Sequence, residues 1–291
     1  MPSRSDPEVI TPRLLRQWPL PVPGSGDDKG ARGTVLVVGG SRFTPGAVLL
    51  AGVAALRAGA GVLQLAVADS TAAALSIQVP EALVIGLPET AAGSVAGRPP
   101  GRLADLAADA RAVAVGPGLD NVDETAVLLR HVIDAAGPDT ALVLDAYALG
   151  ALSHDPDLLA GHRAQSVLTP NLTEAAFLLG REPDEDLGRT AAVLAERYGA
   201  VVSLFGHIAA PDGRTWREES GDAGLGTSGS GDVRAGIVAG LLSRGADAAQ
   251  AACWGAYVHA ATGLRLAPRF GRIGFLAREL LDEVPRTIAE I

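Results

Sequence analysis

Short runs of consecutive apolar residues recur along the chain, each bounded by glycine or polar residues. Uninterrupted runs of this kind are typical of strands that are buried on both faces of a parallel sheet. They occupy residues 34–38, 62–67, 112–115, 141–144, 166–168 and 201–205. Helical apolar spacing fills segments between them, at residues 47–57, 123–136, 172–179 and 187–198. The alternation predicts an α/β fold with a mostly parallel central sheet.

The two ends of the chain differ from this middle part. Residues 1–30 contain six prolines and three glycines, which predicts a loop-rich arm with one short helix around residues 12–18. We therefore expect the fold proper to begin at Thr34. The C-terminal part predicts three helices, which end near residues 243, 262 and 282; the second begins near residue 247 and the third near residue 273.

Two further segments complete the predicted fold. Residues 207–210 and 215–218 flank the sequence Pro-Asp-Gly-Arg, which is typical of a hairpin turn. Residues 89–102 lack periodicity and predict an exposed loop. Since neither a linker nor a repeat divides the chain, we expect a single domain over residues 29–291, preceded by a proline-rich arm at residues 1–28.

Composition narrows the classes of partner. The 291-residue chain has a net charge of −9 and Lys29 is its only lysine, which argues against nucleic acid or a membrane surface as a partner. A single cysteine, Cys253, excludes an intrachain disulfide and fits a reducing compartment. The chain shows neither an apolar signal segment nor a run of transmembrane length. We expect a soluble, cytoplasmic protein, whose alanine-rich helices favour a homo-oligomer such as a tetramer.

The most informative stretch is the glycine-rich segment at residues 221–232. Its five glycines lead directly into an apolar helical pattern that starts at Val233. A helix N-terminus has free backbone N–H groups and the positive end of the helix dipole, and glycine lets a phosphate approach these groups closely. Asp232 lies at this point. Its carboxylate is either the N-cap of the helix or a base directed at a substrate hydroxyl, and the sequence leaves both interpretations open.

Other turns follow the predicted strands. Gly39-Gly40 comes after the first buried strand, and Asp145 follows the strand at 141–144. Ligands of open α/β sheets bind beyond the carboxyl ends of the strands, so Asp145 either points into this crevice or caps the next helix. Asn171 and Glu174 follow the strand at 166–168, just as Asp145 follows the strand at 141–144. They form an N-cap with an acidic first turn, or they face the crevice to hold a metal-bridged phosphate or orient a substrate.

As a set, these motifs carry a resemblance that none of them carries alone. The chain resembles the ribokinase-like superfamily and, within it, the ADP-dependent NAD(P)H-hydrate dehydratases. The resemblance implies a three-layer α/β/α sandwich and extends from about Lys29 to the last helix. The matching stretches are Lys29-Gly30, Gly33–Ser41, Pro45-Gly46-Ala47, Ala54–Gly61, Val115–Leu119, Leu144-Asp145-Ala146, Leu168-Thr169-Pro170 and Ser230-Gly231-Asp232.

The family resemblance implies a repair reaction. NADH or NADPH that has taken up water across a double bond of the nicotinamide ring is phosphorylated by ADP on the added hydroxyl. Phosphate then leaves, AMP is released and the double bond is restored. A phosphate ester is a good leaving group whereas hydroxide is a poor one, which explains why a kinase-like fold would carry out a lyase reaction. Mg²⁺ is expected to accompany the diphosphate, without a dedicated protein cage.

The resemblance also assigns roles to residues. Asp232 would be the base that accepts the proton of the ring hydroxyl. The transferring phosphate would be held by Gly229, Ser230, Gly231 and the helix start. The hydrated nicotinamide nucleotide would contact Ala47, Gly118, Asn171, Asp145 and Glu174. The adenine nucleotide would lie at Gly206 and His207.

The chain departs from the family pattern at three places. Asn171-Leu172-Thr173-Glu174 stands where the family has His-Pro-Gly-Glu, and it is similar to the Pro-Asn-x-x-Glu motif of vitamin-precursor kinases. Leu204-Phe205-Gly206 lacks the lysine of the family's Leu-Lys-Gly stretch, and Asp222 replaces an asparagine. Two alternatives therefore stand beside the dehydratase: an ATP-dependent small-molecule kinase, and a nucleotide-binding protein that has lost activity.

The remaining distinctive residues favour structural interpretations. Cys253 and Trp254 lie in an alanine-rich helical pattern and are expected to pack in the core or an interface. The histidines at 131, 154, 162 and 259 lack metal-ligand spacing, so surface or capping positions are expected. Arg234 is close enough in sequence to Asp232 to reach a phosphate, and a solvated helix face is the other interpretation.

Overall fold

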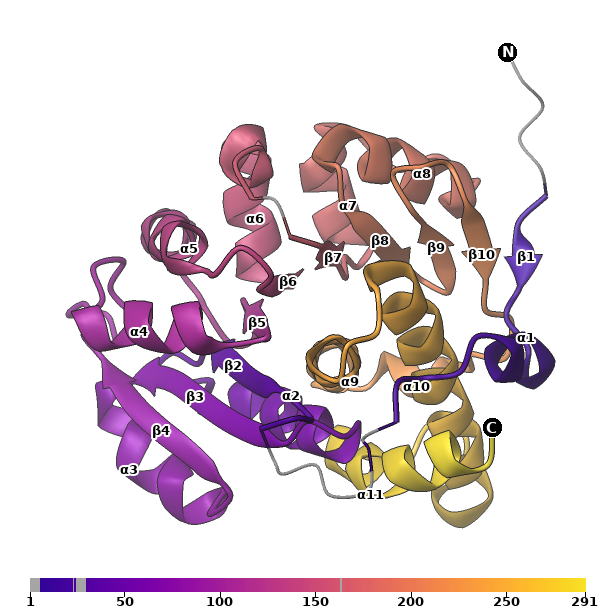
Figure 1. The fold of residues 1–291 in the computed structure, drawn as a ribbon, viewed down its shortest axis with the longest axis horizontal. Helices are drawn as coiled ribbons and strands as arrows, with labels where there is room; N and C mark the ends of the chain where they lie inside the picture. Colours follow the sequence, from indigo (N-terminus) through magenta and orange to yellow (C-terminus); the bar gives the residue numbers. More distant parts are fainter. Residues whose placement is uncertain (1–5, 23, 25–29, 163) are drawn as a thin grey trace.

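The chain folds around one mixed sheet with helices on both of its faces (Figure 1). The computed structural model covers residues 1–291 and describes residues 6–22, 24, 30–162 and 164–291. Lys29 and the expected domain boundary at residues 28–29 lie outside the described residues. The described strands are β1 (Glu8–Val9), β2 (Thr34–Val38), β3 (Val62–Ala68), β4 (Ala82–Leu87), β5 (Ala112–Val115), β6 (Ala141–Leu144), β7 (Ser166–Leu168), β8 (Val201–Leu204), β9 (His207–Ala209) and β10 (Thr215–Arg217).

The order of the strands is β1-β10-β9-β8-β7-β6-β5-β2-β3-β4. The seven strands from β8 to β4 pair in parallel, whereas β8, β9 and β10 pair in antiparallel fashion. In β2, Val35 and Val37 face one core while Leu36 and Val38 face the other. The uninterrupted apolar runs are therefore strands covered on both faces, as predicted.

Helices form the two outer layers. The described helices are α1 (Pro12–Gln17), α2 (Pro45–Arg57), α3 (Asp69–Gln78), α4 (Gly101–Asp109), α5 (Val122–Ala135), α6 (Tyr147–His154), α7 (Leu172–Leu179), α8 (Leu187–Tyr198), α9 (Ser230–Ser243), α10 (Ala248–Phe270) and α11 (Ala277–Ala289). Helices α4 to α8 cover one face of the sheet, and α2, α3, α9, α10 and α11 contribute to the core on the other. The predicted three-layer α/β/α sandwich is confirmed. Among the described residues, no helix has both the length and the hydropathy of a membrane span.

The segment between β3 and β5 contains three elements that the sequence did not predict. These are α3, β4 and α4. Only Leu75 of α3 is buried, so α3 lacks a strong apolar period. Strand β4 is an edge strand with four of its six positions partly or fully exposed, but its sequence Ala-Leu-Val-Ile-Gly-Leu is an uninterrupted run without polar residues that should have predicted a strand. The expectation of an exposed loop at 89–102 is wrong in part, because Ser94 and Val95 are buried at 6% and 2% exposure and α4 begins at Gly101.

The N-terminal residues join the fold before Thr34, where we expected it to begin. The predicted short helix is present as α1, and its Leu15 is fully buried. Strand β1 pairs in parallel with β10, and the Trp18 and Trp216 rings lie 5.8 Å apart. The indole of Trp254 on α10 donates a hydrogen bond to the Trp18 carbonyl at 2.9 Å. This segment therefore closes the β10 edge of the sheet.

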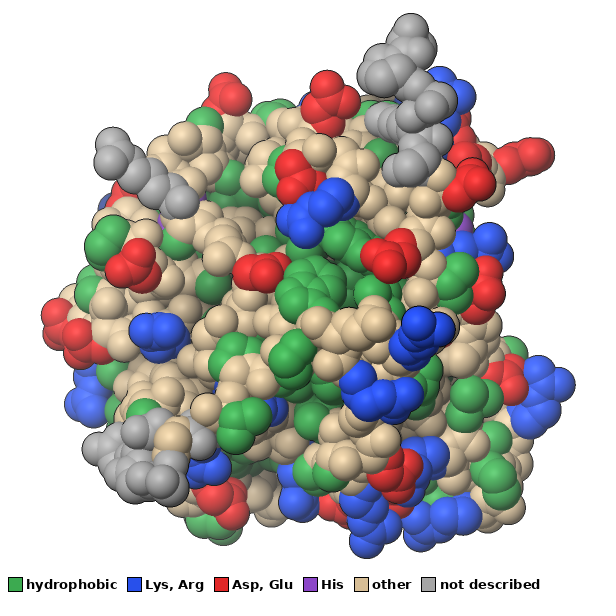
Figure 2. All heavy atoms as spheres, turned by 45° about the vertical axis from the view of Figure 1, so that its right-hand side comes forward, with side chains coloured by type: hydrophobic (Ala, Val, Ile, Leu, Met, Phe, Trp, Pro, Cys, Tyr) green, Lys and Arg blue, Asp and Glu red, His purple; other side chains and the backbone are tan. Residues whose placement is uncertain are grey.

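The C-terminal helices differ in length from the prediction. Helix α10 extends to Phe270, eight residues beyond the expected end, and α11 covers Ala277–Ala289, further along than expected. Cys253 lies fully buried in α10, as predicted. On the face shown in Figure 2, acidic and basic side chains are interspersed, and basic ones gather in its lower part with carboxylates between them.

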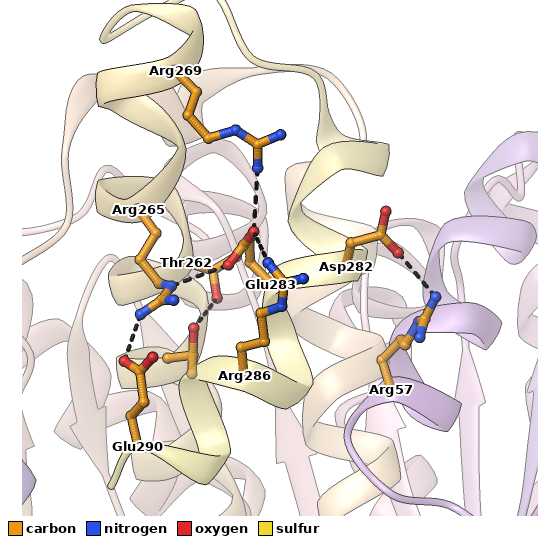
Figure 3. Close-up of polar contacts among 9 residues, drawn as sticks. Arg57, Thr262, Arg265, Arg269, Asp282, Glu283, Arg286 and Glu290 are labelled. Carbon is orange, nitrogen blue, oxygen red and sulfur yellow. Dashed lines mark hydrogen bonds and ion pairs between the residues drawn. The ribbon is translucent and has the colours of Figure 1, made fainter.

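Glu283 holds α10 and α11 together. Its carboxylate is buried and accepts hydrogen bonds from Arg265 at 3.1 Å, Arg269 at 3.3 Å and Arg286 at 3.2 Å (Figure 3). A separate ion pair at 2.9 Å joins Arg57 of α2 to Asp282 of α11. The arginines are partly exposed and remain hydrated, so this network fixes the relative position of the helices more than it stabilises the fold.

Helices α2 and α9 approach more closely than ordinary side chains allow. A Cβ atom added at Gly236 would lie 2.1 Å from the Ala51 carbonyl oxygen, and one at Gly240 would lie 2.4 Å from the Ala55 carbonyl oxygen. The two glycines are one helical turn apart, and so are the two alanines. Helix α9 is buried on nearly all sides. The apolar positions expected on one face are therefore part of a helix that lies inside the core.

We predict that Gly236→Ala destabilises the protein by about 3 kcal/mol, because the new methyl group meets backbone that cannot move without separating α2 from α9. Urea unfolding would measure this. Gly101→Ala is the matched control: Gly101 is also helical, but its Cβ would have no atom within 4 Å. The control should be neutral or slightly stabilising. Equal stability of the two variants would show that the α2–α9 contact is not as tight as described.

Candidate active site

The candidate site begins at the carboxyl ends of four adjacent strands, β7, β6, β5 and β2. The chain runs outward from β2 in one direction through β3 and β4, and in the other through β5 to β8, which makes the β2–β5 boundary the switch point of the sheet. The turns that follow these two strands are bonded together. Gly40 N–H donates to the Pro117 carbonyl and Ser41 N–H to the Gly118 carbonyl, both at 2.8 Å.

Ala47 and Gly118 meet at this boundary. A Cβ atom at Gly118 would lie 3.0 Å from the Ala47 Cβ and 2.4 Å from the Thr44 carbonyl oxygen, and the φ angle of Gly118 is +70°. The Thr44 hydroxyl donates to the Gly118 carbonyl at 2.6 Å. The two predicted substrate-binding positions are thus brought together, and only glycine fits the second of them.

Asp145 follows β6 and is buried. Its carboxylate accepts a hydrogen bond of 2.8 Å from the Thr169 hydroxyl, whereas α6, which begins two residues later, has no side-chain cap. The interpretation of Asp145 as a helix cap is therefore wrong. Burial raises its pKa, against the opposing effects of Arg234 and of hydrogen bonds from Thr169 and Ala146.

Asn171 and Glu174 form the N-cap with an acidic first turn, the first of the two roles considered for them. They form a capping box at the start of α7, with Glu174 N–H donating to the Asn171 side chain and Asn171 N–H donating to the Glu174 carboxylate, each at 2.9 Å. The same carboxylate lies within electrostatic reach of Asp145. Burial and then the charge of Asp145 raise the pKa of Glu174 to about 7.

The glycine-rich segment ends at the first turn of α9, as predicted. Gly229 is the N-cap residue in a left-handed conformation with φ +86°, so Ser230 and Gly231 start the helix and Asp232 is its third residue. Asp232 is therefore not the cap. It is half-buried, and burial, followed by the charges of Asp145 and Glu174, raises its pKa to about 7. Three carboxylates thus share one electrostatic environment.

A cavity of about 660 Å³ opens on the other side of the α9 N-terminus. Five of the predicted site residues line it: Asn171, Gly206, His207, Ser230 and Gly231. Six others do not: Ala47, Gly118, Asp145, Glu174, Gly229 and Asp232. The predicted site residues therefore fall into two groups, one that lines the cavity and one that does not. The start of α9 contributes residues to both groups.

The β8–β9 turn forms part of the cavity wall. Phe205 and Gly206 are its two central residues and have φ angles of +45° and +79°, which is the geometry of a type I′ turn. A bulky residue is strained in this conformation, and such strain is typical of functional sites. Phe205 lines the cavity with 59% of its surface exposed.

The sequence analysis missed the role of His259. We expected it at the surface or at a cap, but it lines the cavity, and its Nε2 lies 2.8 Å from the hydroxyl of Ser230. Burial and then the charge of Arg234 lower the pKa of His259 to about 3, so the ring is neutral. His131 and His154 are exposed, as expected, whereas His162 is half-buried.

Arg234 also departs from one expectation. It is half-buried rather than on a solvated face, it lines the cavity, and its Nη2 donates to the Thr169 carbonyl at 2.7 Å. The arginine therefore connects the start of α9 to the segment that follows β7.

Comparison with known proteins now identifies the family. The sequence profile described as NAD(P)H-hydrate dehydratase matches residues 35–286. The chain belongs to this family. It is 47% identical over 284 residues to the ADP-dependent (S)-NAD(P)H-hydrate dehydratase of Xanthomonas campestris, and the match covers 95% of this chain and 94% of that protein.

Other relatives of the NAD(P)H-hydrate dehydratase family differ in length. The chain is 37% identical to the bifunctional NAD(P)H-hydrate repair enzyme of Moorella thermoacetica, over 94% of this chain, and it spans 52% of that protein. The crystal structure of the ADP/ATP-dependent NAD(P)H-hydrate dehydratase of Bacillus subtilis, co-crystallised with ATP/Mg²⁺, has a TM-score of 0.84 at 28% identity, with coverage of 98% and 99%. A ribokinase-like superfamily protein of Enterococcus faecalis shares the fold, with a TM-score of 0.80 at 22% identity and coverage of 97% and 95%.

The departure from the NAD(P)H-hydrate dehydratase pattern at Asp222 is balanced in the structure. The Asp222 carboxylate accepts hydrogen bonds from Arg272 at 2.7 and 2.9 Å and caps the short 3₁₀ helix η2 (Ala223–Gly226). The extra negative charge in the cavity wall is therefore paired with an arginine from the α10–α11 loop.

Among the described residues we find no group of three side chains arranged to hold a metal ion.

We predict that Asp232→Asn raises the free energy of unfolding at pH 8. The pKa of Asp232 is raised to about 7, so the fold favours the protonated carboxyl; the stability that the proton contributes is complete below the ordinary pKa and is lost as the pH rises through 7. An amide does not ionise. The gain should be about 1–2 kcal/mol at pH 8 and much smaller at pH 4, as measured by urea unfolding.

The control for this prediction is Asp105→Asn, because Asp105 is an exposed carboxylate on α4. The free energy of unfolding of this variant should equal that of the unmodified protein at both pH values. If the two variants show the same pH dependence, the electrostatic description of Asp232 is incorrect.

Proposed function

We propose that the protein restores NADH or NADPH from the hydrated form by an ADP-dependent dehydration that releases AMP and phosphate. One observation carries the proposal beyond family membership. Asp232, a half-buried carboxylate with a pKa raised to about 7, lies in the first turn of α9 beside Ser230 and Gly231, which line the nucleotide-sized cavity, and within electrostatic reach of Asp145 at the end of β6. A base for a substrate hydroxyl and an anion-binding helix start therefore occur at one point.

In the first step, the hydroxyl on the nicotinamide ring attacks the terminal phosphorus of ADP. Asp232 accepts the hydroxyl proton, and the bond between phosphorus and the bridging oxygen breaks to release AMP. A pKa of about 7 suits this role, because the carboxylate is partly ionised at neutral pH and is more basic than an ordinary aspartate.

The start of α9 supports the phosphoryl group during transfer. The N–H groups of the first helical turn lie at the positive end of the dipole; that of Ser230 already donates to the Thr227 carbonyl at 3.2 Å, whereas that of Gly231 has no intrahelical acceptor. Gly231 is exposed, and a Cβ atom there would have no atom within 4 Å, so the phosphate has room to approach. Fixed donors of this type stabilise charge as it develops.

In the second step, the ring nitrogen lone pair expels phosphate as the carbon–oxygen bond breaks, and loss of a proton from the neighbouring carbon restores the double bond. The hydrated nucleotide would lie along the β2–β5 edge of the sheet at Ala47 and Gly118, with Asp145 after β6 and with Asn171 and Glu174 at the start of α7. The adenine nucleotide would lie in the cavity at Gly206 and His207. Support for this division comes from the cavity lining, which includes Gly206 and His207 but not Ala47, Gly118, Asp145 or Glu174; Asn171 lines the cavity and would lie where the two ligands meet.

Magnesium belongs to the nucleotide in this proposal. Because the described residues form no three-ligand cluster, the ion would enter with the diphosphate as part of the co-substrate. We also propose a cytoplasmic location and a homo-oligomeric state; the buried, unpaired Cys253 supports the former, and light scattering of the purified protein would test the latter.

The alternative of an ATP-dependent vitamin-precursor kinase rested on Asn171 and Glu174. Their capping box gives this pair a structural reason that does not depend on the substrate, and the relative at 47% identity is named as a dehydratase. The kinase is therefore not favoured, and it serves as one outcome of the test.

We predict that the protein regenerates the absorbance of reduced nicotinamide from hydrated NADH when ADP is supplied. Asp232→Asn should lower kcat at least about 100-fold, because the base is lost while the fold remains. Asp105→Asn, the matched control, should retain full turnover. Parallel reactions with ATP, and with hydrated NADPH, would define the donor and the substrate.

Three outcomes would contradict the proposal in different ways. Phosphorylation of a vitamin precursor by ATP, without recovery of NADH, would indicate the kinase. Nucleotide binding without any turnover would indicate a protein that has lost activity. Full activity of Asp232→Asn would remove this residue from its role.

A further inference from the structure

We propose that the guanidinium of Arg234 is the receptor for the diphosphate of the nucleotide. The inference rests on the proposed function, because it names the group that holds the co-substrate's phosphates in the cavity. Lys29, the only lysine of the chain, lies outside the described residues, so among the described residues a cationic side-chain contact to a polyphosphate would come from arginine.

The pairing of charges in the cavity wall singles out this residue. Arg217 pairs with Glu219 at 3.3 Å, and Asp222 pairs with Arg272 at 2.7 Å. Glu218 accepts hydrogen bonds from the backbone N–H groups of Ser220 at 2.7 Å and Gly221 at 3.1 Å. Arg234 is the remaining charged side chain of the cavity lining, and among the described residues no carboxylate oxygen lies within 4.0 Å of its nitrogens.

The hydrogen bonds of Arg234 leave most of its donors unused. A guanidinium has five N–H donors, and one of them, on Nη2, reaches the Thr169 carbonyl at 2.7 Å. The Nε atom is buried without a hydrogen-bond partner, and Nη1 donates to none of the described residues. The Nη1 atom is not among the buried atoms that lack a partner, so its unused donors are the ones that an anion in the cavity would reach.

The surroundings of Arg234 place it correctly for a diphosphate. Ser230 and Gly231 of the α9 start line the same cavity, and the N–H group of Gly231 has no intrahelical acceptor. Asp145 and Glu174 attract the guanidinium, although neither contacts it directly. Arg234 therefore lies near both the carboxylates of Asp145 and Glu174 and the anion-binding start of α9, and it forms no ion pair with either carboxylate.

A purely compensating role is the competing explanation. If Arg234 served only to balance Asp145 and Glu174, its removal would change stability and leave nucleotide affinity unaltered. If Arg234 binds the diphosphate, its removal weakens the binding of ligands that carry phosphates and leaves the binding of those without phosphates unchanged. Adenosine and ADP share the same base and sugar, so their comparison isolates the phosphate contact.

The test is equilibrium binding of ADP and adenosine to the unmodified protein, Arg234→Leu and Arg234→Lys. The unmodified protein should bind ADP more tightly than adenosine. Arg234→Leu should bind ADP at least about tenfold more weakly and adenosine within about twofold of the unmodified protein. Arg234→Lys should recover part of the ADP affinity, since the charge returns without the forked donors.

Arg244→Leu is the matched control. Arg244 is also half-buried, caps the other end of α9, and donates to the carbonyls of Ala58 and Pro21 at 2.9 Å each. Its loss should lower the melting temperature without changing the ratio of ADP to adenosine affinity. If Arg234→Leu does not fold, Arg234→Lys decides, because unchanged ADP affinity in that variant overturns the inference.

The binding experiment also separates this inference from the proposed function. If the unmodified protein binds ADP no more tightly than adenosine, or Arg234→Leu binds ADP normally, Arg234 is not the receptor. If ADP binds as described but hydrated NADH is not repaired, the proposed function fails while the role of Arg234 stands.

Discussion

The close contact between α2 and α9 is the constraint on which the site depends. Gly236 and Gly240 let the backbone of α9 rest on the carbonyls of Ala51 and Ala55. Helix α2 follows β2 directly, so its position is fixed by the sheet. A helix packed against it at backbone distance is fixed as well, and the first turn of α9 is thereby delivered to the edge where β2, β5, β6 and β7 end. Small residues at helical spacing thus determine where an anion is able to bind.

The site combines groups that a folded protein would not assemble for stability alone. Burial raises the pKa of Asp145, Glu174 and Asp232; the charge of Asp145 also raises the pKa of the other two, and that of Glu174 raises the pKa of Asp232. Phe205 occupies a left-handed turn position that favours glycine or asparagine. Arg234 retains a buried donor without an acceptor. Such local costs are characteristic of functional sites, and the buried two-sided core around them supplies the stability that permits them.

Sequence reasoning reached the architecture because parallel strands buried on both faces leave an uninterrupted apolar run, as in 34–38 and 112–115. It identified Asp232 and the start of α9 because a glycine-rich turn before a helix is typical of a phosphate-binding site. It did not find α3, where small alanines leave no clear apolar face, and it overlooked β4, whose sequence Ala-Leu-Val-Ile-Gly-Leu has no polar residue. His259 and Arg234 were placed only by tertiary structure: a lone histidine in an alanine-rich helix gives no sign of its hydrogen bond to Ser230, 29 residues away.

The raised pKa values have a consequence for the thermodynamics of ligand binding. Glu174 and Asp232 each titrate near pH 7, so the free protein carries a fractional number of protons at this position at neutral pH. An anionic ligand placed beside them makes ionisation still less favourable. We therefore expect the complex to take up protons from solution, and the measured heat of association to vary with the ionisation enthalpy of the buffer. Nucleotide affinity and proton concentration are, in this arrangement, linked variables.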